Sequence, residues 1–106
     1  MSTVSTHVLD AALGRPAAGV VVILRSADGT QLDAATTDVG GRARFDVAVP
    51  TGDHELLFGT GQWFAEQDRE TFFPAVTLSF TVTDGQPHYH VALLLSPFAY
   101  TTYRGS

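Results

Sequence analysis

The stretch VTLSFTVT, residues 76–83, alternates strictly between apolar and hydroxyl-bearing side chains. Its four apolar residues, all at even positions, fall on one face of an extended chain, and its Thr and Ser residues fall on the other. A strand of this kind packs one face against a core and leaves the other face wetter. The pattern therefore predicts a half-buried β-strand over 75–83.

Short apolar runs separated by turn signals recur about every ten residues along the rest of the chain. This spacing is typical of an all-β sandwich and not of βαβ units. Eight strands are predicted, at 5–11, 19–26, 30–37, 42–49, 54–60, 75–83, 87–96 and 98–104. The segment VVVIL at 20–24 is apolar on both faces, so we expect it to lie centrally in its sheet.

Two glycine-containing dipeptides and one helical segment complete the expected chain path. Asp28-Gly29 and Gly40-Gly41 each separate two predicted strands and supply the positive φ angles that tight hairpins need. GQWFAEQDRE, residues 61–70, carries helix formers before the stop at Pro74. We therefore expect two hairpins and one short helix.

The composition indicates one globular domain, residues 1–106, with 44% hydrophobic and 16% charged residues. A net charge of −5 without a basic cluster argues against nucleic acid or an anionic membrane surface as a partner. Because cysteine is absent, disulfides and thiolate metal sites are excluded. The N-terminus resembles no signal peptide, and no apolar run approaches the roughly 20 residues of a membrane span, which favours a cytoplasmic location.

The period-two rule also sorts the polar residues of two other strands. In HYHVALLL, the outward set is His88, His90, Ala92 and Leu94, and the core set is Tyr89, Val91, Leu93 and Leu95. In GRARFDVAV, the inward set is Phe45, Val47 and Val49, and the outward set is Arg42, Arg44, Asp46 and Ala48. An outer face that combines His with Ala and Leu is apolar enough to favour a subunit interface, so we expect a homo-oligomer.

The residues alone leave several roles open for these polar groups. His88 and His90 have the pattern of ordinary polar residues on a half-exposed strand. Their His-x-His spacing also fits a zinc site, with His7 as a third ligand and water as the fourth. Arg42, which follows Gly40-Gly41, has by default the role of a solvated hairpin charge.

Four segments in order carry a family likeness over residues 5–106. They are STHVLDAALGRPAAGVVV near the start, FGTGQWF, TFFPAVTLSFTV, and HYHVALLLSPFAYTTYRGS at the end. Together they resemble the 5-hydroxyisourate hydrolases, the enzyme branch of the transthyretin family. The final YRGS is the most specific part, because hormone-carrying transthyretins lack it. Two departures, Gly40 in place of Asp and Ala92 in place of Pro, touch no matched functional residue.

The resemblance implies an eight-stranded, two-sheet transthyretin-like sandwich with one short helix. It further implies a homotetramer, built as a dimer of dimers, with active sites in the channel between the dimers. The resemblance implies no cofactor. Residue by residue, the matched positions are catalytic His7, Arg42, His90 and Ser106, and substrate-binding Tyr103 and Arg104.

The implied reaction is hydrolysis of the ring amide of 5-hydroxyisourate to 2-oxo-4-hydroxy-4-carboxy-5-ureidoimidazoline. A histidine with a pKa near 6.5 can activate water as a general base, and His7 and His90 are the candidates. Arg42 offers a permanently charged donor fork for the developing oxyanion. We expect Ser106 to orient a histidine or the water through its hydroxyl, with a terminal carboxylate nearby, rather than to act as an acyl-forming nucleophile.

Two other functions remain open at this point. A transthyretin-like carrier would bind a small aromatic hormone in the same channel. A structural sandwich module, of the kind appended to surface proteins, would need no site at all. The two channel histidines, the arginine and YRGS favour the hydrolase over both.

Overall fold

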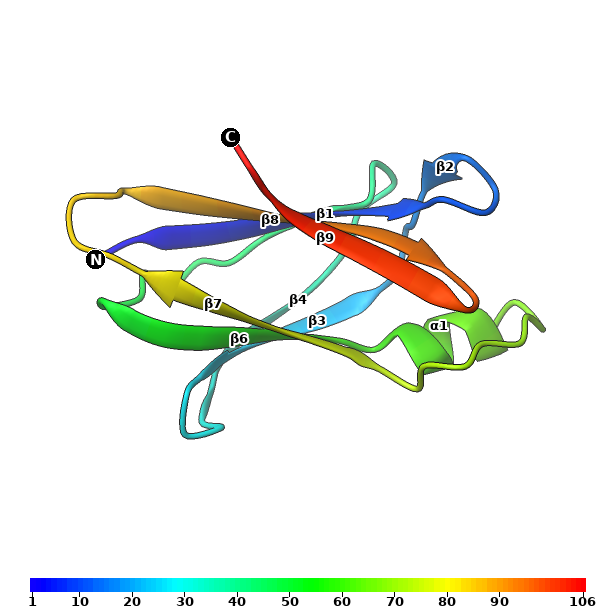
Figure 1. The fold of residues 1–106 in the computed structure, drawn as a ribbon, viewed down its shortest axis with the longest axis horizontal. Helices are drawn as coiled ribbons and strands as arrows, with labels where there is room; N and C mark the ends of the chain where they lie inside the picture. The colour runs from blue at the N-terminus through cyan, green and yellow to red at the C-terminus, as the bar shows by residue number, and fades with distance from the viewer.

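The computed structural model describes residues 1–106 as two β-sheets packed face to face, with one short helix at one end of the sandwich (Figure 1). The first sheet contains β1 (Thr3–Asp10), β2 (Arg15–Pro16), β5 (Arg42–Arg44), β8 (His88–Ser96) and β9 (Ala99–Gly105). The second contains β3 (Val21–Ser26), β4 (Gln31–Thr36), β6 (Gly52–Phe58) and β7 (Val76–Val82). The helix α1 spans Thr60–Ala65. The predicted all-β sandwich with one helix is confirmed.

Strand β1 organises the first sheet because it pairs on both edges. It runs parallel to β8, which pairs antiparallel with β9. Its other edge pairs with β5 over residues 5–7 and with β2 over residues 9–10. Four strands that come from the two ends and the middle of the sequence therefore lie side by side in the order β5, β1, β8, β9.

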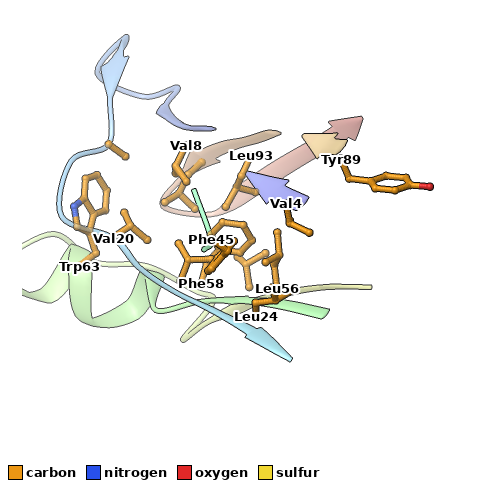
Figure 2. Packing of buried hydrophobic residues seen from close by; sticks show 14 of the residues in the cluster. Val4, Val8, Val20, Leu24, Phe45, Leu56, Phe58, Trp63, Tyr89 and Leu93 are labelled. Carbon is orange, nitrogen blue, oxygen red and sulfur yellow. The ribbon is translucent and has the colours of Figure 1, made fainter. Parts of the chain in front are cut away.

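The core lies between the sheets and follows the alternation of their strands. β1 and β8 bury Val4, Val8, Leu93 and Leu95, and β3 and β6 bury Val22, Leu24, Leu56 and Phe58. Figure 2 shows Phe45 and Phe58 near the middle of this cluster, with Trp63 over one end and Tyr89 at the other. Fully burying a Leu or Phe side chain contributes about 1.5–3 kcal/mol, so this layer dominates the stability of the sandwich.

Two predictions for residues 38–49 were wrong. The predicted strand at 42–49 is only three residues long, because the chain leaves the ladder after Arg44: the amide of Asp46 donates to the Asp33 carboxylate, and Val49 forms an isolated bridge with Ser2. The Gly40-Gly41 turn does not close a hairpin either, since β4 and β5 belong to different sheets. It crosses between the layers, and Gly41 adopts a φ of 76° where a Cβ would lie 2.3 Å from the carbonyl oxygen of Val8.

Other expectations hold more closely. Asp28-Gly29 does connect two antiparallel partners, β3 and β4, and Gly29 has a φ of 88°. The VVVIL segment forms most of β3, which lies between β4 and β6 as expected of a central strand. The two-residue strand β2 was not predicted, so the sandwich has nine strands rather than eight.

The helix is shorter than the predicted 61–70. It ends at Ala65, and beyond it the amide of Arg69 donates to the carbonyl of Phe64 while Asp68 takes a left-handed φ of 54°. Arg69 then pairs with the buried carboxylate of Asp10, which ties this turn to the end of β1. The structure contains no helix of the length and apolarity that crossing a bilayer requires.

Candidate active site

The outer face of the first sheet carries a compact group of polar side chains in register. Paired strands place opposite residues on the same face, so each row across the sheet can be read from the ladder. One row runs through Arg42, His7, Ala92 and Tyr103, the next runs through Arg44, Ser5, His90 and Gly105, and a third joins Thr3 and His88. Residues from both termini and from the middle of the chain thus meet on one surface.

The predicted outward face of β8 is partly closed within a single chain. Ala92 faces outward as expected but is only 3% exposed, because its row neighbours His7 and Tyr103 stand on either side of this short side chain. The apolar outward patch predicted from His, Ala and Leu is therefore smaller than expected. The groups that remain accessible on this face are mainly polar.

An open cavity of about 350 Å³ lies on this face. It brings together three of the predicted catalytic residues, Arg42, His90 and Ser106. Ser5, His88 and Arg44 line it as well, and Ala43 is its one hydrophobic lining residue. A cavity with this lining suits a small polar ligand that is rich in hydrogen-bonding groups.

His90 is the centre of the group. Its Nδ1 lies 2.8 Å from the hydroxyl of Ser5, and its ring packs over Gly105, where a Cβ would come within 2.4 Å of the His90 Cδ2. Burial is the largest reason that the pKa of His90 lies below its ordinary value of 6.5. Electrostatic interactions with His7, Arg42 and His88 lower this pKa further. His90 is therefore neutral, and able to accept a proton, at neutral pH.

His7 lies beside this cavity and contacts the crossing turn. Its Nε2 is 2.9 Å from the carbonyl oxygen of Gly40, and a carbonyl can only accept, so Nε2 carries the proton in this hydrogen bond. In the neutral ring the lone pair is then on Nδ1. The centres of the His7 and His90 rings are 6.5 Å apart. The two histidines can therefore act on one small molecule from neighbouring rows.

Arg42 extends into solvent from the start of β5, and Asp38 holds its backbone in place. The Asp38 carboxylate accepts hydrogen bonds from the amides of Arg42 at 3.0 Å and Gly40 at 2.9 Å. The hydrogen bond from the Arg42 amide is the main cause that lowers the pKa of Asp38. The crossing turn thus fixes the position from which the Arg42 guanidinium reaches the cavity.

The structure separates Tyr103 and Arg104 from the other predicted residues. Both line a second cavity of about 340 Å³ that lies between β7 and β9, and of the six predicted site residues only His90 lines both cavities. Arg104 is stacked over the ring of Tyr89, 4.8 Å from its centre. Tyr103 is 52% exposed and stays in the same row as His7.

Comparison with known proteins agrees with this arrangement. Residues 4–105 match the family described as HIUase/Transthyretin. The chain belongs to this family. Its members among known proteins include the 5-hydroxyisourate hydrolase of Caulobacter vibrioides, which is 42% identical with both chains fully covered.

Solved structures of the HIUase/Transthyretin family match the whole sandwich. The 5-hydroxyisourate hydrolase of Klebsiella pneumoniae superimposes with a TM-score of 0.92 at 41% identity, and 100% of each chain is covered. Sea bream transthyretin in complex with thyroxine matches with a TM-score of 0.89 at 32% identity, over 96% of this chain and 93% of that one. The predicted family and fold are confirmed, and the hydrolase relatives confirm the predicted enzyme class.

The zinc alternative has no matching geometry in this member of the family. A zinc site of this kind requires the ring nitrogens of His7, His88 and His90 to lie around one common position. No three His, Cys, Asp or Glu side chains in the chain are arranged to hold a metal ion. Instead, the two ring nitrogens of His88 lie 2.6 Å from the hydroxyl of Thr3 and 2.8 Å from the hydroxyl of Ser5.

Sequence reasoning missed Thr3, Ser5 and Gly105 as parts of this site. The signal for the first two was present, because Thr3 and Ser5 alternate with the buried Val4 and Thr6 and so share the face of His7. What the alternation does not show is that β1 pairs with β8, more than 80 residues away, in a register that sets Ser5 beside His90.

Proposed function

We propose that the protein hydrolyses the ring amide of 5-hydroxyisourate and releases 2-oxo-4-hydroxy-4-carboxy-5-ureidoimidazoline. The observation that carries the proposal is the meeting of His90, Arg42 and Ser106 around one polar cavity, with His7 on the neighbouring row. The names and close similarity of the hydrolase relatives support the same substrate.

His90 is proposed as the general base. A neutral imidazole takes a proton from water, whose oxygen attacks the amide carbonyl carbon, and general-base catalysis of this kind contributes about 10²–10⁴-fold in rate. The lowered pKa of His90 keeps its neutral form populated at and below neutral pH. The ring C–N bond then breaks, and the proton returns to the leaving nitrogen.

Arg42 is proposed to stabilise the oxyanion that forms when water adds to the carbonyl. Its guanidinium is always charged and offers planar donors that suit carbonyl and urea-like oxygens. The hold of Asp38 on the Arg42 amide supports this role, because preorganised donors stabilise charge without moving during the reaction. His7, with its Nδ1 lone pair, is proposed to share the work of accepting protons.

Ser106 is proposed to orient the water or a histidine from the cavity rim. Tyr103 and Arg104 are proposed to contact the substrate from the second cavity, on the far side of His90. The exposure of Tyr103 supports a ligand-contact role in preference to a packing role. The substrate would therefore be held on both sides of the imidazole.

A homotetramer, built as a dimer of dimers, is proposed from the family resemblance. The edge strand β9 supports it, because β9 presents Tyr100 and Tyr103 with exposed fractions of 38% and 52%. Unpaired edges with aromatic side chains favour association with another copy. The cytoplasmic location and the absence of nucleic-acid and membrane partners stay predictions from the sequence.

The carrier function is less well supported by the cavity. Transthyretin from sea bream is described in complex with thyroxine, and its fold matches this chain. Pockets for drug-sized apolar ligands are predominantly hydrophobic, whereas Ala43 alone is hydrophobic among the residues that line the cavity shared by His90, Arg42 and Ser106. This lining favours a small polar substrate.

A spectrophotometric assay tests the proposal. 5-Hydroxyisourate is generated from urate in the cuvette, and its ultraviolet decay is followed with and without the purified protein after EDTA treatment. Faster decay with the protein supports the proposal, with no need for added metal. Decay at the spontaneous rate, unchanged by added zinc, would refute the proposed activity, whereas decay accelerated only by zinc would refute the metal-free mechanism.

A further inference from the structure

Four side chains from β1 and β8 form a continuous hydrogen-bonded chain that ends at His90. Thr3 Oγ1 lies 2.6 Å from Nδ1 of His88, Ser5 Oγ lies 2.8 Å from Nε2 of His88, and the same Ser5 Oγ lies 2.8 Å from Nδ1 of His90. The chain exists because the two strands are parallel and in step, with Thr3 opposite His88 and Ser5 opposite His90. Ser5 is the bridge between the two rings.

When both rings are neutral and the Ser5 hydroxyl donates its hydrogen within this chain, proton counting leaves two arrangements. The Ser5 hydroxyl has one hydrogen, so it can donate to only one of the two nitrogens that flank it, and the other nitrogen must donate to the Ser5 oxygen. In the first arrangement, His90 carries its proton on Nδ1, Ser5 donates to Nε2 of His88, and His88 donates from Nδ1 to Thr3. In the second, every donor is reversed, and His90 carries its proton on Nε2.

Only the first arrangement leaves the Nε2 of His90 with a free lone pair. The surroundings of Thr3 favour the first arrangement. The Thr3 hydroxyl also lies 3.5 Å from the carbonyl oxygen of Pro87, to which it can donate a weak hydrogen bond. The Thr3 oxygen is then left to accept from Nδ1 of His88. In a neutral imidazole, the hydrogen bond made by one ring nitrogen determines whether the other nitrogen is protonated or has a free lone pair.

We propose that Ser5 and His88 are positioning residues that hold His90 in the Nδ1–H tautomer and receive a proton through it during the reaction. This inference rests on the proposed hydrolase function. When Nε2 of His90 takes a proton from water, its Nδ1 proton passes to the oxygen of Ser5, and the hydroxyl proton of Ser5 passes to Nε2 of His88. His90 is again neutral, and the positive charge is on His88. The reverse path returns the proton for delivery to the leaving nitrogen.

The surroundings of both rings fit a transient, not a permanent, charge. Burial, and then the positive charge of Arg44, keep the pKa of His88 below its ordinary value of 6.5. A cationic His88 therefore gives its proton back readily. The ionisable groups around the two rings on this face, from β1, the crossing turn and β5, are His7, Asp38, Arg42 and Arg44. Asp38 is the one acidic side chain among them, and the amides of Gly40 and Arg42 occupy its carboxylate. Ser106, the last residue of the sequence, lines the same cavity from the end of β9 and brings the terminal carboxylate to this face.

The test compares Ser5→Ala with Ser5→Thr, which keeps the hydroxyl, and with Ser96→Ala as a matched control. Ser96 lies on β8 away from the cavity and donates to the carbonyl of Ala99. Two readouts are needed: steady-state kinetics with 5-hydroxyisourate over a range of pH, and ¹⁵N chemical shifts of the histidine rings, which report the tautomer without substrate. Thermal melting of each variant establishes that it is folded.

We expect Ser5→Ala to lower kcat about tenfold or more with little change in KM, because a base held in the wrong tautomer loses turnover and not binding. Ser5→Thr should recover most of this loss, and Ser96→Ala should match the unmodified protein. The nitrogen shifts should show the Nδ1–H tautomer of His90 in the unmodified protein and a mixture in Ser5→Ala.

The two readouts separate this inference from the proposed function. An unmodified protein whose His90 is mainly in the Nε2–H tautomer, or an unchanged His90 tautomer together with unchanged kcat in folded Ser5→Ala, would overturn the role of Ser5. If the unmodified protein does not accelerate decay of 5-hydroxyisourate, the proposed function fails, while the nitrogen shifts still decide whether Ser5 sets the tautomer. His88→Gln gives a second test, since it should shift the tautomer as Ser5→Ala does.

Discussion

Gly105 lies directly opposite His90 in the β8–β9 ladder, and the imidazole ring occupies the space that a side chain at position 105 would need. A Cβ built on Gly105 would lie 2.4 Å from Cδ2 of His90. Gly105 is not in the left-handed region, so its importance is steric and not conformational. The last strand therefore helps to set where the proposed base stands.

Gly105→Ala should displace the His90 ring and weaken its hydrogen bond to Ser5. We expect kcat for 5-hydroxyisourate to fall by about 10- to 100-fold, because small misplacements of a catalytic group are costly. The melting temperature should change little, since the contact lies on the outer face and not in the core. Gly59→Ala is the control, because Gly59 has a φ of −77° and its Cβ would make only ordinary contacts from 3.6 Å. Full activity in Gly105→Ala would contradict the placement.

If His90 is the general base, as proposed, the acid limb of the pH profile should follow its protonation. Its pKa lies below 6.5 because of burial first and nearby positive charge second, so the neutral base persists to lower pH than for a free histidine. We therefore expect the acid-side decline of kcat/KM to be centred below pH 6.5. A decline centred above pH 6.5 would show that another group limits the rate.

Arg42→Gln separates two effects of one positive charge. The loss of the proposed oxyanion donor should lower kcat by about 10²–10³-fold. Removing the charge should also raise the pKa of His90, since a neighbouring cation disfavours protonation, and the acid limb should move to higher pH. Arg15→Gln, on β2 at the far end of β1, should change neither the rate nor the acid limb. An Arg42→Gln profile with an unmoved acid limb would argue against proximity of the two groups in solution.

The pair between Asp10 and Arg69 should matter for stability and not for catalysis. Arg69 Nη1 lies 2.7 Å from a carboxylate oxygen of Asp10, whose side chain is only 1% exposed. Arg69→Met leaves that carboxylate buried with only the amides of Ala12 and Leu13 as donors. We expect a loss of about 2–3 kcal/mol in the free energy of unfolding, measured by urea denaturation.

The control for this loss is the pair of Arg25 and Glu55, whose side chains are each 27% exposed, and where Arg25→Met should cost less than about 1 kcal/mol. The pH dependence gives a second check on Asp10. Burial raises its pKa, but the hydrogen bond from Arg69 and those from the amides outweigh this, and the pKa is lowered below 3.8. The contribution of the pair is therefore present above pH 3.8 and is lost as the pH falls below it. Equal costs for Arg69→Met and Arg25→Met would show that burial of the Asp10 carboxylate does not make its pairing with Arg69 more important for stability.

The two layers of the fold were predicted well from the sequence, because the alternation within each strand indicates which of its faces is buried. The alternation at Val76–Val82 and the inward positions of Phe45 and Val49 are local patterns, and the structure buries them as expected. The error at Gly40-Gly41 has a different origin. A glycine pair indicates a turn but not which sheet the chain enters next, and here the chain crosses to β1.

Only some of the residues of the candidate site could be predicted from the sequence. His7 and His90 stood out by residue type and by family resemblance, whereas for Ser5 and Thr3 the alternation indicates only the face of the strand on which they lie. Their role depends on the parallel register between β1 and β8, a contact between the two ends of the chain. Alternation gives the face of a residue but not its neighbour on the next strand.

The proposed hydrolysis of 5-hydroxyisourate depends on the outer-face site around His90. Its most direct test is the ultraviolet decay of freshly generated 5-hydroxyisourate with the unmodified protein and with His90→Asn, both treated with EDTA and shown to be folded. Rapid decay is expected with the unmodified protein, and His90→Asn is expected to lose about 10²-fold or more of this activity. Equal decay with the two proteins, whether fast or at the spontaneous rate, would contradict the proposal.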